Sequence, residues 1–268
     1  MTSGVPKFEK LTSIDSCTAT IVLLHGLGDT PQGILRLARL LRSRPGLNHV
    51  QFIVPAAPLR RLTATGHTTT AWFDIRSFAF NTDGTTAIQE DEEGMRQSVD
   101  SLDALLSGLR DSGIDPSRTV LGGFSQGGAM TLLTGLTTAT KLAGLFVLSG
   151  RLPMRQQIKS MVSPHASSLP VFYGHGTADS VVPHALGRNA ADFMISELEF
   201  TAAPISSLST RILDWLSPNS GTPIQAKPTP TGLAFHSYVG LAHELGSEEL
   251  DDLASWLNIL IPAVSESQ

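Results

Sequence analysis

Short runs of apolar residues alternate along the chain with longer segments in which apolar residues recur every three or four positions. The short runs predict buried strands over residues 19–24, 50–54, 117–121, 142–148, 169–173 and 232–239. The periodic segments predict helices over residues 31–41, 86–110, 126–138, 183–200 and 247–260. Strands that alternate with helices favour a mostly parallel central sheet with helices on both faces, so we expect the α/β class.

Two segments interrupt this alternation. Residues 55–86 show little periodicity, and a connection of this length within a compact domain usually has a functional role. Residues 201–231 form an insertion rich in Pro, Ser and Thr around a short apolar patch at 212–216. The pattern leaves open a small extra helix, a partner surface or a poorly ordered excursion. Because helix-to-strand connections lie opposite the carboxyl ends of parallel strands, we do not expect this insertion to cover the site. We expect residues 1–268 to form a single domain that carries it.

Composition narrows the classes of protein. The chain has 268 residues and a formal net charge of −5, without a cluster of Lys and Arg, which argues against nucleic acid or an anionic membrane as the main partner. Cys17 is the only cysteine, which excludes an intrachain disulfide and a cysteine-based metal cage. No apolar run reaches membrane-spanning length, so stable membrane insertion is not expected. We expect a soluble enzyme of the cytoplasm, with the nucleus as an open second location.

The segment GGFSQGG at 122–128 contains the pattern G-x-S-x-G. This pattern occurs by chance in loops rich in Gly and Ser. Here, however, a β-branched run precedes it and a periodic apolar run follows it, as a strand–turn–helix requires. Such a turn holds the serine in a strained backbone conformation, and side chains at Gly123 or Gly127 would crowd it. Ser125 is therefore predicted to be a nucleophile exposed at the edge of the sheet.

A serine hydroxyl becomes a good nucleophile only when a base removes its proton, and the base needs an orienting carboxylate. In an α/β-hydrolase these residues follow in the order Ser, Asp or Glu, then His, each after a strand. Asp179 lies just beyond the strand predicted over 169–173 and is the predicted acid. Asp192 and Asp214 are weaker candidates, because one falls in a predicted helix and the other in the insertion.

His243 is the predicted base because it lies between the last predicted strand and the last predicted helix. His236 falls inside that strand and His184 opens a helix, so neither lies on a strand-to-helix loop. We interpret His25 and His175 as structural residues in tight turns beside the site. His67 and His165 are interpreted as exposed loop residues.

The tetrahedral intermediate of acyl transfer needs two N–H donors aimed at its oxygen. One is expected to be the backbone N–H of Gln126, which follows the serine. The other is expected from the turn after the first strand, where Gly26 and Gly28 flank Leu27. A zinc hydrolase is not favoured, because His243-Glu244 lacks a second histidine at helical spacing. We expect no metal and no other cofactor.

Four ordered segments resemble the acyl-protein thioesterase family, which belongs to the phospholipase/carboxylesterase group of α/β-hydrolases. They are LHGLGDT at 24–30, AWFDI at 71–75, LGGFSQGGA at 121–129 and GHGTAD at 174–179. The resemblance implies a minimal α/β-hydrolase fold without a large cap domain. It also implies hydrolysis of fatty-acyl thioesters on cysteines of lipidated proteins, and of lysophospholipids or short esters.

Carried over by position, Ser125, Asp179 and His243 match the family's catalytic triad, and the amides of Leu27 and Gln126 match its oxyanion hole.

Three further positions bear on the substrate. The resemblance places Trp72 near the pocket and makes Val181 a residue of the acyl channel. Arg151 stands where the family commonly has an aromatic residue. In the channel it would disfavour a long acyl chain and favour an anionic substrate, but we favour an outward orientation. The acidic run at 90–93 is interpreted as a solvated face near the positive end of a helix.

Three functions remain as hypotheses. The first is a serine esterase or thioesterase that removes acyl groups from proteins or lysophospholipids. The second is a carboxylesterase for small molecules, with short-chain or anionic esters as substrates. The third is a hydrolase-like binding protein without activity, which predicts the loss of a triad residue, whereas all three are present. The partner is thus an acylated protein or a small acyl ester, and the oligomeric state stays open, a homodimer included.

Overall fold

The computed structural model describes residues 4–79, 89–203 and 230–264. Within them, seven strands form one sheet in the order β1-β3-β2-β6-β7-β8-β9. The strands are β1 (Phe8–Leu11), β2 (Ala19–Leu24), β3 (Val50–Pro55), β6 (Thr119–Phe124), β7 (Gly144–Leu148), β8 (Val171–Gly176) and β9 (Leu233–Tyr238). Only β1 runs antiparallel to its neighbour, β3, and every other neighbouring pair in this sheet is parallel.

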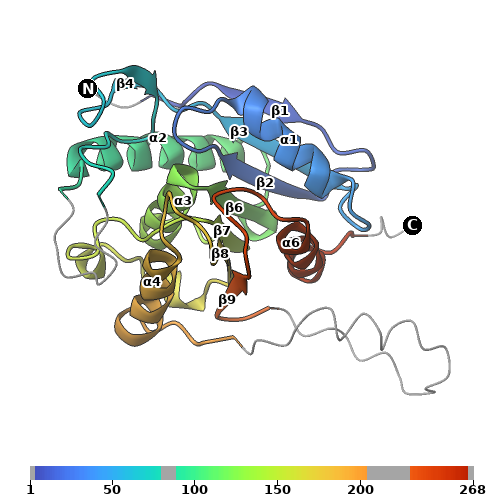
Figure 1. Cartoon of the computed structure of the whole chain (residues 1–268). Coiled ribbons are helices and arrows are strands. Elements are labelled where there is room, and N and C mark those ends of the chain that lie inside the picture. The colour runs from blue at the N-terminus through green and yellow to red at the C-terminus, as the bar shows by residue number, and fades with distance from the viewer. Residues whose placement is uncertain (1–3, 80–88, 204–229, 265–268) are drawn as a thin grey trace.

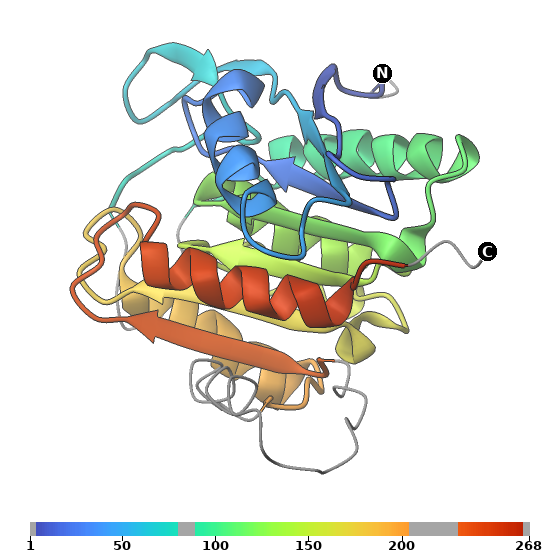
Figure 2. The same cartoon turned by 90° about the vertical axis from the view of Figure 1, so that its right-hand side faces the viewer.

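Helices cover both faces of the sheet. On one face lie α1 (Pro31–Arg42) and α6 (Ser247–Leu260), which face the viewer in Figure 2. On the other lie α2 (Glu92–Asp111), α3 (Gln126–Thr137) and α4 (His184–Glu197) (Figure 1). Two clusters of buried apolar side chains fill the layers between the sheet and these helices. The predicted parallel sheet with helices on both faces is confirmed.

The predicted elements are all present, with boundaries that differ by a few residues in most cases. Strands β2, β3 and β7 are buried at every position, because helices cover both sides of the sheet. A strand buried on both faces needs a continuous apolar run rather than an alternating one. That is the pattern from which these strands were predicted.

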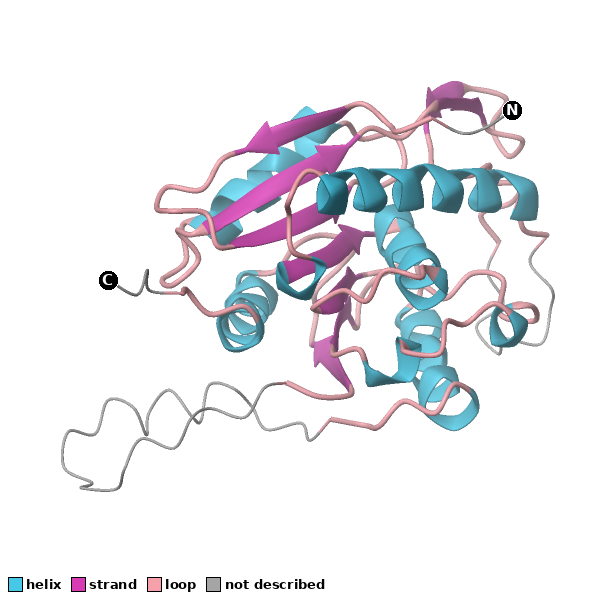
Figure 3. Ribbon diagram, turned by 180° about the vertical axis from the view of Figure 1, so that it is seen from behind, coloured by secondary structure: helices cyan, strands magenta, loops and turns pink. Residues whose placement is uncertain are grey.

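Two strand features were missed. β1 has the sequence FEKL and is largely exposed, so it carries no apolar run. The segment 55–86, predicted to be irregular, contains a hairpin of β4 (Leu59–Arg61) and β5 (Thr68–Thr70) that stands apart from the main sheet (Figure 3). Its strands are only three residues long and lie on the surface, so they show no hydrophobic period.

The helix predicted from residue 86 begins at Glu92 instead. Asp91 is the N-cap, and its Oδ1 accepts the N–H of Gly94 at 3.1 Å. Its Oδ2 accepts the N–H of Asp74 at 2.8 Å, so the cap also anchors the preceding loop. Most of the predicted insertion, residues 204–229, lies outside the described residues. Just before it, Ala202 forms a parallel bridge with Leu233 at the start of β9.

The carboxyl ends of the parallel strands meet at one edge of the sheet, as this topology requires. There the loops after β8 and β9 are bonded to each other. The N–H of Thr177 donates to Tyr238 O at 2.9 Å, and the N–H of Ala178 donates to Leu241 O at 3.0 Å. The loop that carries Asp179 and the loop that carries His243 therefore form one unit beside the end of β6.

Candidate active site

Ser125 occupies a sharp turn between β6 and α3. Its backbone has φ 57° and ψ −118°, a left-handed conformation that is costly for a residue with a side chain. A Cβ at Gly123 would lie 2.5 Å from the carbonyl of Gly127, and a Cβ at Gly127 would lie 2.2 Å from Leu24 O. Both distances are far below van der Waals contact, so the turn requires glycine at both positions. The predicted crowding around the serine is confirmed.

His243 bridges the serine and the aspartate. Its Nε2 lies 2.9 Å from Ser125 Oγ, and its Nδ1 lies 2.7 Å from Asp179 Oδ2. A carboxylate accepts hydrogen bonds, so Nδ1 carries the proton and Nε2 is free to accept from the serine hydroxyl. The ring of Phe124 packs against the imidazole, with the two ring centroids 4.9 Å apart. Position, tautomer and ring plane are thus all constrained.

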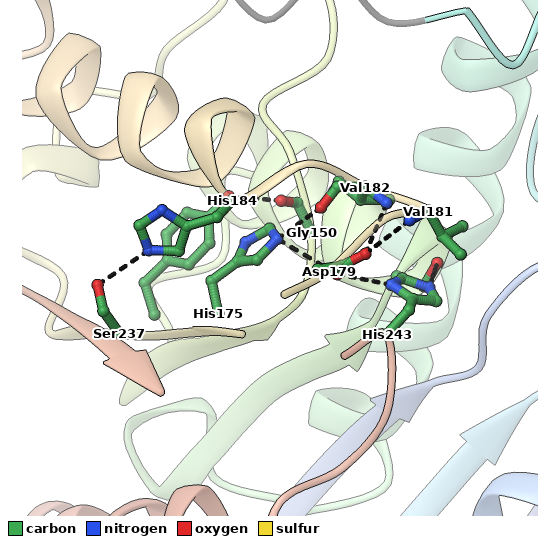
Figure 4. A network of polar contacts seen from close by, with 10 residues as sticks. Gly150, His175, Asp179, Val181, Val182, His184, Ser237 and His243 are labelled. Carbon is green, nitrogen blue, oxygen red and sulfur yellow. Dashed lines mark hydrogen bonds and ion pairs between the residues drawn. The ribbon is translucent and has the colours of Figure 1, made fainter. Parts of the chain in front are cut away.

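The carboxylate of Asp179 is fully buried and holds four contacts (Figure 4). Oδ1 accepts the backbone N–H groups of Val181 at 2.9 Å and Val182 at 2.8 Å. Oδ2 faces His243 Nδ1 at 2.7 Å and lies 3.4 Å from His175 Nε2. Hydrogen bonds from backbone N–H groups stabilise a buried carboxylate. Because they hold Oδ1, the other oxygen, Oδ2, faces the imidazole of His243.

The weaker candidates lie elsewhere. Asp192 is exposed on α4 and pairs with Arg188 at 2.8 Å, and Asp214 falls outside the described residues. His236 stacks on Phe172 at 4.7 Å, and His184 Nε2 lies 2.9 Å from Ser237 Oγ. His67 is exposed as predicted, whereas His165 is half-buried.

His25 and His175, interpreted as structural, are both completely buried. Burial lowers the pKa of each imidazole, which keeps both rings neutral. His25 Nδ1 lies 2.8 Å from Gly26 O, and its Nε2 accepts the N–H of Ala57 at 3.1 Å. His25 therefore braces the turn after β2, as predicted. His175 lies at the end of β8 rather than in a turn.

The two predicted oxyanion donors lie at the ends of β2 and β6. Gln126 is the first residue of α3, and Leu27 lies in the turn after β2. Among the described residues, neither backbone N–H donates to a protein acceptor, whereas the neighbouring N–H of Gly28 donates to Thr70 O at 2.8 Å. Both amides are thus available to a ligand, and their role as an oxyanion hole stays a prediction.

Sequence reasoning missed the side chain of Gln126. Its Oε1 accepts the backbone N–H of Trp72 at 2.8 Å, and its Nε2 donates to Phe73 O at 2.9 Å. The indole Nε1 of Trp72 in turn donates to His25 O at 2.9 Å. This chain of bonds joins the turn that holds Leu27 to the start of α3. No signal in a single sequence reports such contacts.

Trp72, which the resemblance places near the pocket, is only 1% exposed. Its role in substrate binding stays a prediction. Its side chain supports the backbone around the two predicted donors. Val181, by contrast, is 50% exposed directly beside Asp179, where an apolar part of a substrate could contact it. Its assignment to an acyl channel stays a prediction.

The structure corrects the outward orientation favoured for Arg151. Its Nη1 lies 2.5 Å from Glu90 Oε1, and the two side chains are only 13% and 16% exposed. Glu90 Oε2 accepts the N–H of Met154 at 2.7 Å, and the guanidinium lies 5.9 Å from the centroid of the Phe73 ring. Glu90 was expected on a solvated face. That interpretation holds for Glu92 and Glu93, which are exposed in the first turn of α2.

No cluster of three or more His, Cys, Asp or Glu suited to a metal ion occurs in the part of the chain that the structure describes. In the same part, none of the helices combines the length and the apolar character needed to cross a membrane.

Comparisons with known proteins place the chain in a family. A family profile described as Phospholipase/Carboxylesterase matches residues 9–212. The acyl-protein thioesterase 1 of Cryptococcus neoformans is 38% identical over 252 residues, which cover 94% of this chain and 96% of that protein. The acyl-protein thioesterase 1 of Yarrowia lipolytica is 36% identical over 241 residues, covering 90% and 91%. The crystal structure of Zea mays acyl-protein thioesterase 2 superposes with a TM-score of 0.70 at 26% identity, covering 96% and 99%. The chain belongs to the acyl-protein thioesterase family, within the phospholipase/carboxylesterase group of α/β-hydrolases.

Proposed function

We propose that this protein is a serine hydrolase that cleaves acyl thioesters and esters. Ser125 is the nucleophile, His243 the general base and acid, and Asp179 the carboxylate that orients the imidazole. One observation carries the proposal: a single imidazole lies within hydrogen-bond distance of both partners, 2.9 Å from Ser125 Oγ and 2.7 Å from Asp179 Oδ2. A nucleophile, a base and an orienting group at these distances are what acyl transfer to serine needs.

The reaction has two halves. Ser125 Oγ attacks the acyl carbonyl carbon while His243 Nε2 takes the hydroxyl proton. The tetrahedral intermediate then expels the thiol or alcohol, which takes that proton from Nε2 and leaves an acyl ester on Ser125. Water attacks this ester with the same help, the free acid departs, and the proton returns to Ser125 Oγ. The protein, the substrate and water together supply every proton and electron pair in these steps.

The amides of Leu27 and Gln126 are proposed to stabilise the oxyanion in both halves. Their N–H groups come from two elements that the Gln126 side chain and Trp72 connect. Losing one such donor typically costs about 100–1000-fold in rate. The dipole of α3, which begins at Gln126, favours negative charge at the same place.

Acylated proteins are the proposed substrates, and the cytoplasm is the proposed location. The support is that relatives 36% and 38% identical to this chain are named acyl-protein thioesterases, and that the apolar side chain of Val181 is half exposed beside the triad. A second candidate is a carboxylesterase for short acyl esters. The Arg151–Glu90 pair favours it, because a charged pair stands where the family commonly has an aromatic residue, and charged side chains suit a long acyl chain less.

The test compares two substrates on the purified protein: a peptide that carries a palmitoyl thioester on cysteine, and a butyryl ester of a small alcohol. We expect a higher kcat/KM on the palmitoyl peptide. Ser125→Ala should lower both rates by at least about a thousandfold, while Ser160→Ala, an exposed serine, should change neither. Preference for the butyryl ester would favour the second candidate. Full activity of Ser125→Ala would refute both.

A further inference from the structure

His175 lies at the end of β8, four residues before Asp179, and its side chain is completely buried (Figure 4). The first turns of α4 pack directly on its ring, so that a Cβ at Gly187 would lie 2.3 Å from His175 Nδ1. The edge of the ring of His184 approaches it from the same helix, with centroids 5.6 Å apart. The imidazole is therefore held in one place by its surroundings.

Three contacts connect this ring to the carboxylate of Asp179. His175 Nε2 lies 2.8 Å from Val182 O, and the N–H of Val182 donates to Asp179 Oδ1 at 2.8 Å. Asp179 Oδ2 lies 3.4 Å from the same Nε2. A carbonyl oxygen only accepts hydrogen bonds, so Nε2 carries the proton of the imidazole. That N–H fixes Val182, and Val182 fixes Asp179.

The other ring nitrogen, Nδ1, makes no contact of this kind with the described part of the chain. His175 Nδ1 is buried and has no hydrogen-bond partner among the residues that the structure describes, which typically costs about 1–3 kcal/mol. A phenylalanine of similar shape would fill the space without this cost. A buried imidazole with one unpaired nitrogen needs an explanation. Here the paired nitrogen, Nε2, lies beside Val182 O and the carboxylate of Asp179, the proposed acid.

We propose that His175 is a positioning residue, which holds the turn at Val181–Val182 and thereby aims the carboxylate of Asp179 at His243 Nδ1. The proposal rests on the proposed function, because it gives Asp179 its role through His243. The neutral ring donates a hydrogen bond without adding a positive charge, so the imidazole of His243 keeps the full attraction of the carboxylate. If His175 served packing alone, only the shape of its ring would matter and the N–H donor would not.

Two substitutions separate these roles. H175F keeps the ring and loses the donor, whereas H175Q loses the ring and keeps an amide N–H at about the reach of Nε2. We expect H175F to lower kcat about ten- to hundredfold with little change in KM, because misplaced catalytic groups act on the chemical step. Its melting temperature should stay close to that of the wild type, because removal of the unpaired Nδ1 offsets the lost hydrogen bond to Val182 O. H175Q should be less stable than H175F and yet have the higher kcat.

His236 provides the matched control. It is also a histidine within a strand, but its ring stacks on Phe172 in the opposite layer of the sheet, so H236F should keep the wild-type kcat. Rates are expressed per folded protein, measured by circular dichroism. If H175F does not fold, H175Q and H175N repeat the comparison, since asparagine cannot reach the position of Nε2, and H175Q should then have the higher kcat.

Two results would overturn the positioning role. One is a wild-type kcat in H175F. The other is a kcat in H175Q that is no higher than that of H175F or, where H175F does not fold, of H175N. Ser125→Ala, measured in the same assay, separates this failure from that of the proposed function. If Ser125→Ala is inactive while H175F is fully active, only the role of His175 is wrong. If Ser125→Ala is active, the proposed function is wrong as well.

Discussion

Gln126 Oε1 accepts the backbone N–H of Trp72 at 2.8 Å, so the residue after the proposed nucleophile is bonded to a loop that lies 54 positions earlier. Its Nε2 donates to Phe73 O in the same loop. One side chain thus satisfies a buried N–H and a buried C=O, and the indole of Trp72 extends the connection to His25 O, beside the turn that holds Leu27. This connection gives the site a rigid backbone frame in addition to its triad.

Gln126→Leu keeps the backbone N–H and removes both side-chain bonds. We expect kcat to fall about ten- to hundredfold, because the oxyanion donors lose their common support. The free energy of unfolding should fall by about 1–3 kcal/mol for each backbone group left unpaired. Steady-state kinetics and urea denaturation measure the two effects. Gln97→Leu, on the exposed face of α2, should change stability by no more than about 0.5 kcal/mol and leave kcat unchanged.

The glycines of the turn make a second test. Gly127→Ala puts a Cβ 2.2 Å from Leu24 O, so the turn must distort, and we expect little or no labelling of Ser125 by a fluorophosphonate probe. Gly108→Ala is the control, because nothing lies within 4 Å of its Cβ and it sits on the exposed face of α2. That variant should label normally and gain up to about 1 kcal/mol of stability. Normal labelling of Gly127→Ala would mean that the turn tolerates a side chain.

The Arg151–Glu90 pair should contribute more than a surface ion pair does. A double-mutant cycle with Arg151→Met and Glu90→Gln should give a coupling of about 1–2 kcal/mol in the free energy of unfolding, because both side chains are largely buried. The same cycle on Lys159 and Glu197, which are 52% and 42% exposed, should give a much smaller coupling, because solvent screens this surface pair. Equal couplings would show that the first pair is as well solvated as the second.

Glu249 predicts a pH dependence of stability. Its side chain is completely buried at the start of α6, and burial raises the pKa of the carboxyl to about 7. The folded protein therefore binds more protons than the unfolded chain between the ordinary pKa and about 7, so stability falls as the pH rises through this interval. Glu249→Gln removes the effect and can still accept the N–H of Gly246.

Urea denaturation of wild type and Glu249→Gln from pH 4 to pH 9 measures this difference directly. The variant should gain on the wild type as the pH rises, by a few kcal/mol at most, and the gain should level off above about pH 7. A constant difference across the whole range would mean that Glu249 ionises normally in the folded protein.

Whether a feature of the fold or the site can be predicted from the sequence depends on the kind of contact that forms it. The order Ser125, Asp179, His243 could be predicted because each residue follows a parallel strand, and parallel strands bring such loops to one edge. β1 could not, because FEKL lies exposed at the edge of the sheet and shows no apolar run. The ion pair of Arg151 with Glu90 spans 61 positions, and local pattern carries no information about such contacts. The same holds for the bond between Gln126 and Trp72.

The acyl-enzyme on Ser125 is the most direct test of the proposed mechanism. The protein is mixed with a palmitoyl thioester, quenched in acid within milliseconds, digested and mapped by mass spectrometry. We expect the acyl group on the peptide that contains Ser125, and no acylated peptide from Ser125→Ala. An acyl group on another residue, or thioester hydrolysis by Ser125→Ala at the wild-type rate, would contradict the account.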